Sequence, residues 1–213
     1  LPMHLNKIIS FLGLSIIFVL ITSCSEPKLP RLDSNATILA FGDSLTQGVG
    51  SRKTPYPKVL AEITGLNVIN AGISGETTAG GKLRFQSLLD QHQPDLVILL
   101  EGGNDILRNV SPQVTQANLA EMIEMAAAES IPIIFLGVPE KKLFSDSANF
   151  YKELAQEYSS KLTGAFIFDG EIISNLLRSP EFKSDSIHLN SAGYRALAEH
   201  IKAMLESSGA YSE

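Results

Sequence analysis

Apolar runs alternate along the chain, from residue 36 onward, with longer segments in which apolar side chains recur every three or four residues. Short apolar runs bounded by polar loops are typical of buried strands, and a period of about 3.6 residues is typical of amphipathic helices. The third and fourth runs are almost entirely apolar, as expected for strands covered on both faces of a parallel sheet. The pattern predicts strands at 37–41, 67–70, 95–100, 131–138 and 165–168.

Helices are predicted between and after these strands. The second of them is only weakly periodic, around Leu83, Leu88 and Leu89. The last has a continuous apolar face and can be capped by Asn190 or Ser191. The predicted helices are 56–64, 77–91, 113–129, 148–162 and 191–206.

This alternation of strands and helices indicates an α/β fold with a doubly wound parallel sheet. Right-handed crossovers between parallel strands place the carboxyl ends of the strands at one edge. Doubly wound sheets of this kind bind their ligands at that edge. We therefore expect functional residues in the loops that directly follow strands.

The first 24 residues have a different character. Lys7 precedes a largely apolar run of 14 residues, from 8 to 21. A membrane-spanning helix needs about 20 such residues, so the run has the length of a signal peptide. We therefore expect residues 1–23 to be a signal peptide and the protein to be exported.

The end of this segment, Ile21-Thr22-Ser23-Cys24, resembles the bacterial lipobox, in which a small residue precedes a lipidated cysteine. That resemblance implies a lipoprotein that is anchored in a membrane of the cell envelope through Cys24 and faces the periplasm. A plain signal peptide with an incidental cysteine and an uncleaved anchor are the alternatives. Cys24 is the only cysteine of the chain, so no disulfide can form within it.

Residues 24–35 are polar and contain two prolines, which predicts a short tether ahead of one domain at 36–213. A chain of 213 residues, 44% of them hydrophobic, can bury one core, and we expect a monomer. Its 17 basic and 23 acidic residues give a net charge of −6. This charge, without a local cluster of Lys and Arg, argues against nucleic-acid binding.

Polar, glycine-rich loops follow the predicted strands and contain the groups that acyl transfer requires. Ser44 follows the first strand as a candidate nucleophile, and it needs a base to accept its proton. His188 falls in a loop at the expected edge, whereas the other three histidines lie in the signal peptide, at a helix end and inside the last helix. Asp185 precedes His188 by three residues and can orient its imidazole ring.

Donors for a developing oxyanion are also available at this edge. The backbone N–H groups of Ser44 and Gly72 and the side-chain amide of Asn104 can converge there. A glycine also lets a carbonyl oxygen approach the backbone closely. Each of these residues alone is more often a turn or capping residue than a catalytic one. Their joint placement after three strands, together with Asp185 and His188, favours a catalytic site.

Four segments resemble, in order, the signature blocks of the SGNH (GDSL) hydrolases: 41–46, FGDSLT; 70–78, NAGISGETT; 102–108, GGNDILR; and 185–190, DSIHLN. The similarity spans residues 37–205 and is closest to the bacterial periplasmic arylesterase and thioesterase/lysophospholipase branch. It implies a flavodoxin-like α/β/α sandwich with a five-stranded parallel sheet and no need for a cofactor or metal. It also implies a Ser44/Asp185/His188 triad and an oxyanion hole of Ser44, Gly72 and Asn104.

Two features depart from the family's pattern. Leu189 follows the histidine where close relatives often have proline, and leucine leaves the backbone of His188 less restricted. The loop 139–148, PEKKLFSDSA, has no clear counterpart, so the substrate preference stays open.

Other classes of site fit the sequence less well. Gly48-Val49-Gly50 lacks the third glycine of a dinucleotide-binding loop, and neither G-x-x-x-x-G-K-[ST] nor G-x-S-x-G occurs. Zinc-binding signatures are also missing. We therefore expect a serine hydrolase that cleaves small-molecule or lipid esters, such as lysophospholipids, aryl esters or acyl thioesters, through an acyl-serine intermediate. A carbohydrate O-acetylesterase of the cell envelope and a non-catalytic module of the same fold are the alternatives.

Overall fold

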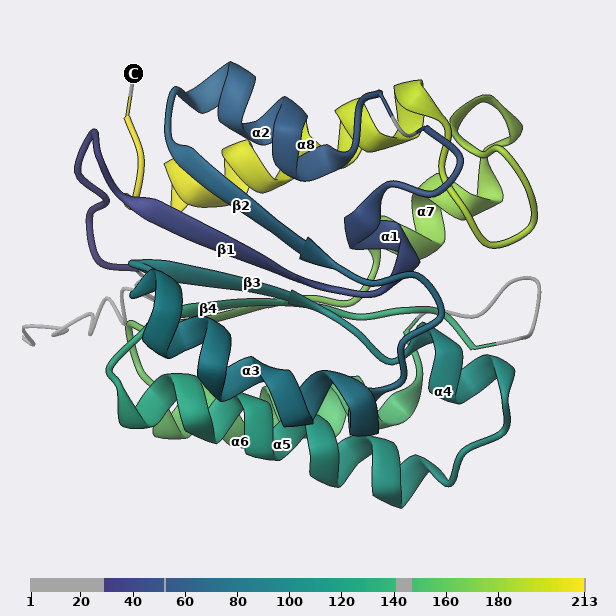
Figure 1. The fold of residues 1–213 in the computed structure, drawn as a ribbon, viewed down its shortest axis with the longest axis horizontal. Coiled ribbons are helices and arrows are strands. Elements are labelled where there is room, and N and C mark those ends of the chain that lie inside the picture. Colours follow the sequence, from purple (N-terminus) through teal and green to yellow (C-terminus); the bar gives the residue numbers. More distant parts are fainter. Residues whose placement is uncertain (1–28, 52, 141–146, 213) are drawn as a thin grey trace, which may run out of the picture.

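The computed structural model of the chain describes residues 29–51, 53–140 and 147–212. Its centre is a sheet of five parallel strands in the order β2-β1-β3-β4-β5 (Figure 1). The strand order reverses at β1, and doubly wound sheets bind ligands at such a switch point. The strands are β1 (Thr37–Gly42), β2 (Asn67–Gly72), β3 (Leu96–Leu100), β4 (Ile133–Leu136) and β5 (Phe166–Asp169).

Helices cover both faces of the sheet. In Figure 1, α3, α5 and α6 lie on one face, and α2 and α8 lie together on the other. The shorter helices α1, α4 and α7 lie toward the carboxyl ends of the strands. The helices are α1 (Ser44–Gln47), α2 (Tyr56–Thr64), α3 (Thr78–His92), α4 (Gly103–Leu107), α5 (Pro112–Ala128), α6 (Asn149–Lys161), α7 (Ile172–Arg178) and α8 (Ser191–Ser207), with a 3₁₀ turn at Pro180–Phe182.

The three-layer α/β/α fold with a five-stranded parallel sheet confirms the prediction from the sequence. Each predicted strand and helix is present, with ends that differ by no more than two residues. The pattern does not predict α1, α4 and α7, which have four, five and seven residues. Helices this short contain too few positions to show a periodic apolar face.

The core lies between the sheet and its two helical layers. All residues of β3 are buried, as its apolar sequence predicts. Phe41 of β1 packs edge-on against Phe85 of α3, with ring centroids 4.8 Å apart. The prediction was wrong for Leu83, which is 85% exposed, whereas Phe85 and Leu89 are buried. Leu83 is two residues, about 200° around the helix, from Phe85 and therefore faces away from the sheet.

Part of the predicted tether is folded onto the domain, which corrects the boundary at Ala36. Leu29 and Leu32 are buried in the hydrophobic core, and the N–H of Leu32 donates to the carbonyl of Ala210 at 2.8 Å. Because residues 24–35 are mostly polar, the sequence pattern does not indicate that Leu29 and Leu32 are buried. The folded domain therefore includes residues from Leu29 onward.

The predicted signal peptide, residues 1–23, and the predicted anchor Cys24 lie outside the described residues. Within the part of the chain that is described, no helix is both long enough and apolar enough to cross a membrane.

Candidate active site

Ser44 lies at the carboxyl edge of the sheet, where β1 ends and α1 begins. Gly42 is required at this turn because a β-carbon there would fall 2.0 Å from the carbonyl oxygen of Leu100 in β3. Asp43 then caps α1, since its carboxylate accepts the N–H of Leu45 at 3.0 Å. The close approach of β3 and the cap together determine where Ser44 begins its helix.

The three predicted triad side chains lie in one hydrogen-bonded row. The Nε2 atom of His188 is 3.0 Å from Ser44 Oγ, and its Nδ1 atom is 2.8 Å from Asp185 Oδ2. The fold thus brings the loop after β1 beside the loop before α8. In this geometry a histidine can accept the proton of a serine hydroxyl while a carboxylate fixes the tautomer of the ring.

Asp185 shapes the loop as well as orienting the ring of His188. Its Oδ1 atom accepts the N–H groups of Ile187 and His188, both at 2.8 Å, so the segment folds back on the carboxylate. Partial burial raises the pKa of Asp185, but the bonds from the His188 ring and from these two N–H groups outweigh it, and the pKa is lowered. Asp185 is therefore ionised at neutral pH and can stabilise an imidazolium.

Leu189 anchors the histidine loop to the core, where it is fully buried. It also forms an antiparallel bridge with Lys183, and the N–H of Ser184 donates to the carbonyl of His188 at 2.9 Å. Asn190 then caps α8. At the position where the family often has proline, this chain therefore holds the loop through a buried side chain.

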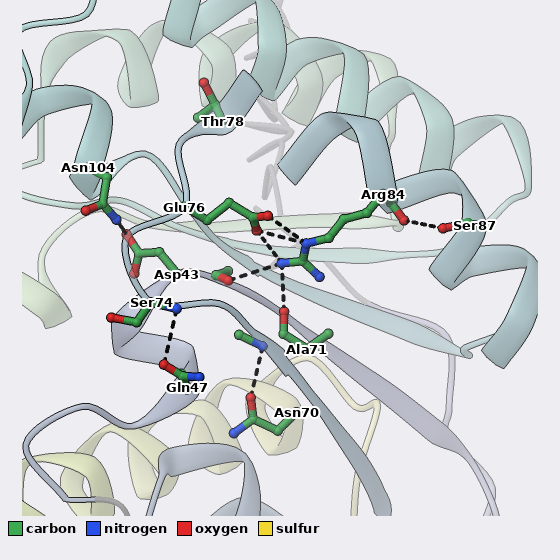
Figure 2. Close-up of polar contacts among 12 residues, drawn as sticks. Asp43, Gln47, Asn70, Ala71, Ser74, Glu76, Thr78, Arg84, Ser87 and Asn104 are labelled. Carbon is green, nitrogen blue, oxygen red and sulfur yellow. Dashed lines mark hydrogen bonds and ion pairs between the residues drawn. The ribbon is translucent and has the colours of Figure 1, made fainter. Parts of the chain in front are cut away.

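Asn104 lies in α4, directly after β3, and its amide is oriented by a carboxylate. Its Nδ2 atom donates to Asp43 Oδ2 at 3.1 Å (Figure 2). An amide nitrogen carries two hydrogens, so the second can be donated to a ligand. The next residue, Asp105, accepts the N–H and the hydroxyl of Thr78 at 2.8 and 2.7 Å, which attaches α4 to the start of α3.

Asp43 is a site residue whose role is not evident from the sequence alone. Burial raises the pKa of its carboxyl to about 6, although the Leu45 N–H, the charge of His188 and the Asn104 amide lower it. The signal in the sequence is its place before Ser44, which suits a helix cap. Its contact with Asn104 depends on the fold and has no such signal.

The structure argues against Gly72 as an oxyanion donor and corrects that prediction. The Gly72 N–H already donates to Asn70 Oδ1 at 3.0 Å (Figure 2). A β-carbon on Gly72 would fall 2.1 Å from the backbone nitrogen of Gln47. Gly72 is therefore a glycine because α1 packs against it.

In the loop 73–76, which follows β2, the N–H of Gly75 is available to bind a ligand. The neighbouring N–H groups all donate within the protein, namely those of Ile73, Ser74 and Glu76. The Gly75 N–H has no acceptor among the residues that the structure describes. Its φ of 80° favours glycine, and the bond from Ser74 to Gln47, 3.2 Å, docks the loop on the helix that Ser44 begins.

A cavity of about 350 Å³ opens beside Ser44 and Asn104. Arg178 and Lys183 contribute polar lining, but most of the wall is apolar: Leu45, Ile106, Leu107, Val138, Pro139, Leu177 and Ile187. An apolar cavity with a few convergent polar groups is typical of a small-molecule site. Among the described residues, no group of three or more His, Cys, Asp or Glu side chains is arranged to hold a metal ion.

Known proteins that resemble this chain indicate its family. Residues 40–196 match the GDSL-like Lipase/Acylhydrolase family. The chain belongs to this family. Among its relatives, an arylesterase of Vibrio mimicus is 31% identical over 176 residues, covering 77% of this chain and 85% of that protein. The thioesterase 1/protease 1/lysophospholipase L1 of Escherichia coli is 30% identical over 178 residues, covering 80% and 83%.

One solved structure and one lipoprotein are also similar to this chain. The crystal structure of TesA superposes with a TM-score of 0.69 at 27% identity, covering 81% of this chain and 99% of that one. The uncharacterized lipoprotein YqeF of Bacillus subtilis is 34% identical over 117 residues, which is 48% of each chain. The family and its esterase relatives identify the protein as an ester-hydrolysing serine hydrolase.

Proposed function

We propose that the protein hydrolyses acyl esters and thioesters through a covalent ester on Ser44, with His188 and Asp185 completing the triad. Ser44 Oγ attacks the acyl carbon while His188 Nε2 accepts the hydroxyl proton, and His188 then gives that proton to the leaving alkoxide or thiolate. His188 next takes a proton from water as the water oxygen bonds to the acyl carbon. The Ser44 oxygen leaves with that proton, which restores the free enzyme and releases the acid.

The oxyanion donors we propose are the N–H groups of Ser44 and Gly75 and the side-chain amide of Asn104. Neither backbone N–H has an acceptor among the described residues, and Asn104 uses one amide hydrogen for Asp43. Donors that are already oriented stabilise the negative charge of the tetrahedral intermediate without reorganisation during the reaction. Gly75 thus replaces Gly72, the oxyanion donor predicted from the sequence.

The observation that carries this proposal is the row from Asp185 through His188 to Ser44, with bonds of 2.8 and 3.0 Å. Ser44→Ala should lower kcat for p-nitrophenyl esters by roughly 10⁴- to 10⁶-fold, as when triad members are removed. Ser160→Ala, at an exposed position near the end of α6, should keep full activity. Undiminished hydrolysis by Ser44→Ala would refute the nucleophile. A wild-type protein without any esterase activity would favour a non-catalytic module.

The substrate we propose is an ester or thioester with an apolar acyl chain. The apolar side chains around the cavity beside Ser44 support this class, as do the names of the arylesterase and thioesterase/lysophospholipase relatives. Acyl esters of increasing chain length, acyl thioesters, lysophospholipids and O-acetylated glycans should be compared by kcat/KM. We expect kcat/KM to rise from acetyl to longer acyl chains. A maximum for O-acetylated glycans would contradict this substrate class and support the carbohydrate O-acetylesterase.

We further propose that the protein is exported and anchored in a membrane of the cell envelope through lipid-modified Cys24. The support is the lipobox resemblance of residues 21–24 and the similarity to a protein named as a lipoprotein. Residues 1–23 would be removed as the signal peptide, and the hydrolase domain would remain on the anchor.

A further inference from the structure

Arg84 of α3 binds three segments, namely the ends of β1 and β2 and the loop that follows β2 (Figure 2). Its Nη2 atom donates to the carbonyl of Ala71 in β2 at 2.9 Å and, at 3.4 Å, to the carbonyl of Gly42 at the end of β1. Its Nε atom lies 2.9 Å from both carboxylate oxygens of Glu76, and Nη2 also binds Glu76. One side chain therefore joins the ends of two strands to the loop 73–76.

The guanidinium of Arg84 is itself held in place. It lies 4.1 Å from the centroid of the Phe41 ring, over the face of that ring. Phe41 in turn packs against Phe85, the next residue of α3. The side chains of Arg84 and Glu76 are only 21% and 11% exposed. Stacking on an aromatic ring and partial burial leave a planar guanidinium few other orientations.

The segments that Arg84 joins carry the proposed nucleophile and one proposed donor. Gly42 precedes Asp43 and Ser44 by one and two residues, and Glu76 directly follows Gly75. On its other side, the carbonyl of Gly75 accepts a bond from Arg108 at 2.8 Å. An oxyanion donor must lie about 2.7–3.1 Å from the charged oxygen, so a small displacement of Gly75 relative to Ser44 weakens the site.

We propose that Arg84 is a positioning residue of the esterase, which holds the Gly75 N–H in the orientation that binds the oxyanion. This inference rests on the proposed function, and Arg84 lies outside the four family-like segments quoted from the sequence. Lysine cannot replace the guanidinium, because a single ammonium group does not reproduce the planar fork that binds a carboxylate and two carbonyls together. Loss of Arg84 also leaves the carboxylate of Glu76 in a partly buried position without its cation.

Removing the contacts that Arg84 makes with Glu76, Ala71 and Gly42 should destabilise the transition state more than it weakens substrate binding. Arg84 does not line the cavity beside Ser44, so KM should change by less than about threefold. The value of kcat should fall roughly 10- to 10²-fold, because a displaced donor loses part of the stabilisation that a complete oxyanion hole provides.

The test compares Arg84→Lys and Arg84→Ala with Lys82→Ala in the full chain. Lys82 lies on the same helix and forms an ion pair with Glu121 at 3.0 Å, which makes it the matched control. Measurements are kcat and KM for a p-nitrophenyl ester, thermal unfolding, and inhibition by a phenylboronic acid, which forms a tetrahedral adduct with a nucleophilic serine. In both Arg84 variants, kcat and the affinity for the boronic acid should fall by similar factors, whereas Lys82→Ala should match the wild type.

A kcat of Arg84→Lys within about twofold of the wild type would overturn the proposal, as would a raised KM at unchanged kcat. A loss of kcat without any loss of boronic acid affinity would also overturn it, because the oxyanion donors would then be intact. If Arg84→Ala does not fold, Arg84→Lys decides, since it keeps the charge and the aliphatic stem. An inactive Ser44→Ala together with a fully active Arg84→Lys would refute the positioning role alone and leave the esterase mechanism in place.

Discussion

Asn104 donates an amide hydrogen to the buried carboxylate of Asp43 at 3.1 Å, so the residue before the proposed nucleophile orients a proposed oxyanion donor. The same carboxylate caps α1 through the N–H of Leu45 at 3.0 Å. One side chain therefore determines both where Ser44 begins its helix and how Asn104 is directed. These two bonds offset part of the cost of burying a carboxylate.

Asp43→Asn should separate the two roles of this side chain. The asparagine oxygen can still accept the N–H of Leu45, but its amino group cannot accept a hydrogen from Asn104. A hydrogen bond to a charged group contributes about 1.5–3 kcal/mol, so kcat should fall roughly 10- to 10²-fold. Steady-state kinetics with a p-nitrophenyl ester and thermal unfolding check this, with the exposed Asp33→Asn as control. An unchanged kcat would show that Asp43 does not orient Asn104 for the reaction.

The raised pKa of Asp43 leads to a prediction for the acid limb of the pH–rate profile. Because burial raises its pKa to about 6, its carboxyl gains a proton as the pH falls through that value and becomes a weaker acceptor for Asn104. In the wild type, kcat/KM should therefore fall as the pH drops through about 6. In Asp43→Asn this component of the acid limb should be absent, and identical acid limbs in the two proteins would contradict this.

Asn104→Ala should lower kcat by roughly 10²- to 10³-fold, the effect of losing one oxyanion donor, while KM changes little. The comparison is Asn67→Ala, which removes a bond to Thr37 at the opposite, amino-terminal ends of β1 and β2. Single-turnover and steady-state rates with the same ester measure the effect on acylation. If Asn104→Ala kept the wild-type rate, the oxyanion would have to be bound by backbone N–H groups alone.

The positions of the long elements follow from the sequence because their burial is periodic or continuous. The fully buried β3 and the apolar face of α8 are both visible as patterns of residue type. The proximity of Ser44, Asp185 and His188 follows from the fold class, since loops at one edge of a doubly wound sheet converge. No detail of packing is needed for either conclusion.

The choice of oxyanion donor and the position of α4 depend on individual tertiary contacts. Such contacts produce no recognisable pattern of residue types in the sequence. Gly72 and Gly75 are both loop glycines in the sequence, and the bond from the Gly72 N–H to Asn70 distinguishes them. The short helix α4 is held by the buried Asp105, whose partner Thr78 lies 27 residues away. Tertiary contacts of this kind decide which donors are free, and residue type alone does not report them.

The raised pKa of Glu101 leads us to expect that the stability of the protein depends on pH. It is fully buried directly after β3, and burial, followed by the charges of Asp43, Glu76 and Asp105, raises its pKa well above the ordinary 4.5. Above pH 4.5 the unfolded chain therefore releases a proton that the folded protein keeps, so the free energy of unfolding falls as the pH rises. Glu101→Gln removes this titration. Urea unfolding from about pH 5 to about pH 8 should show a shallower decline in the variant, and parallel curves would contradict a protonated Glu101.

The proposed lipid anchor predicts the chemistry of the mature N-terminus. Protein isolated from bacterial membranes should begin at Cys24 and carry acyl groups, which mass spectrometry of the intact chain and of its N-terminal peptide can detect. Cys24→Ser should abolish the acyl mass, whereas Ser25→Ala should retain it. A mature chain that begins elsewhere, or an unmodified Cys24, would contradict the anchor and support a plain signal peptide. Because Cys24 precedes the described domain, which begins at Leu29, and contributes nothing to the row from Asp185 to Ser44, Cys24→Ser should keep the wild-type kcat on soluble esters.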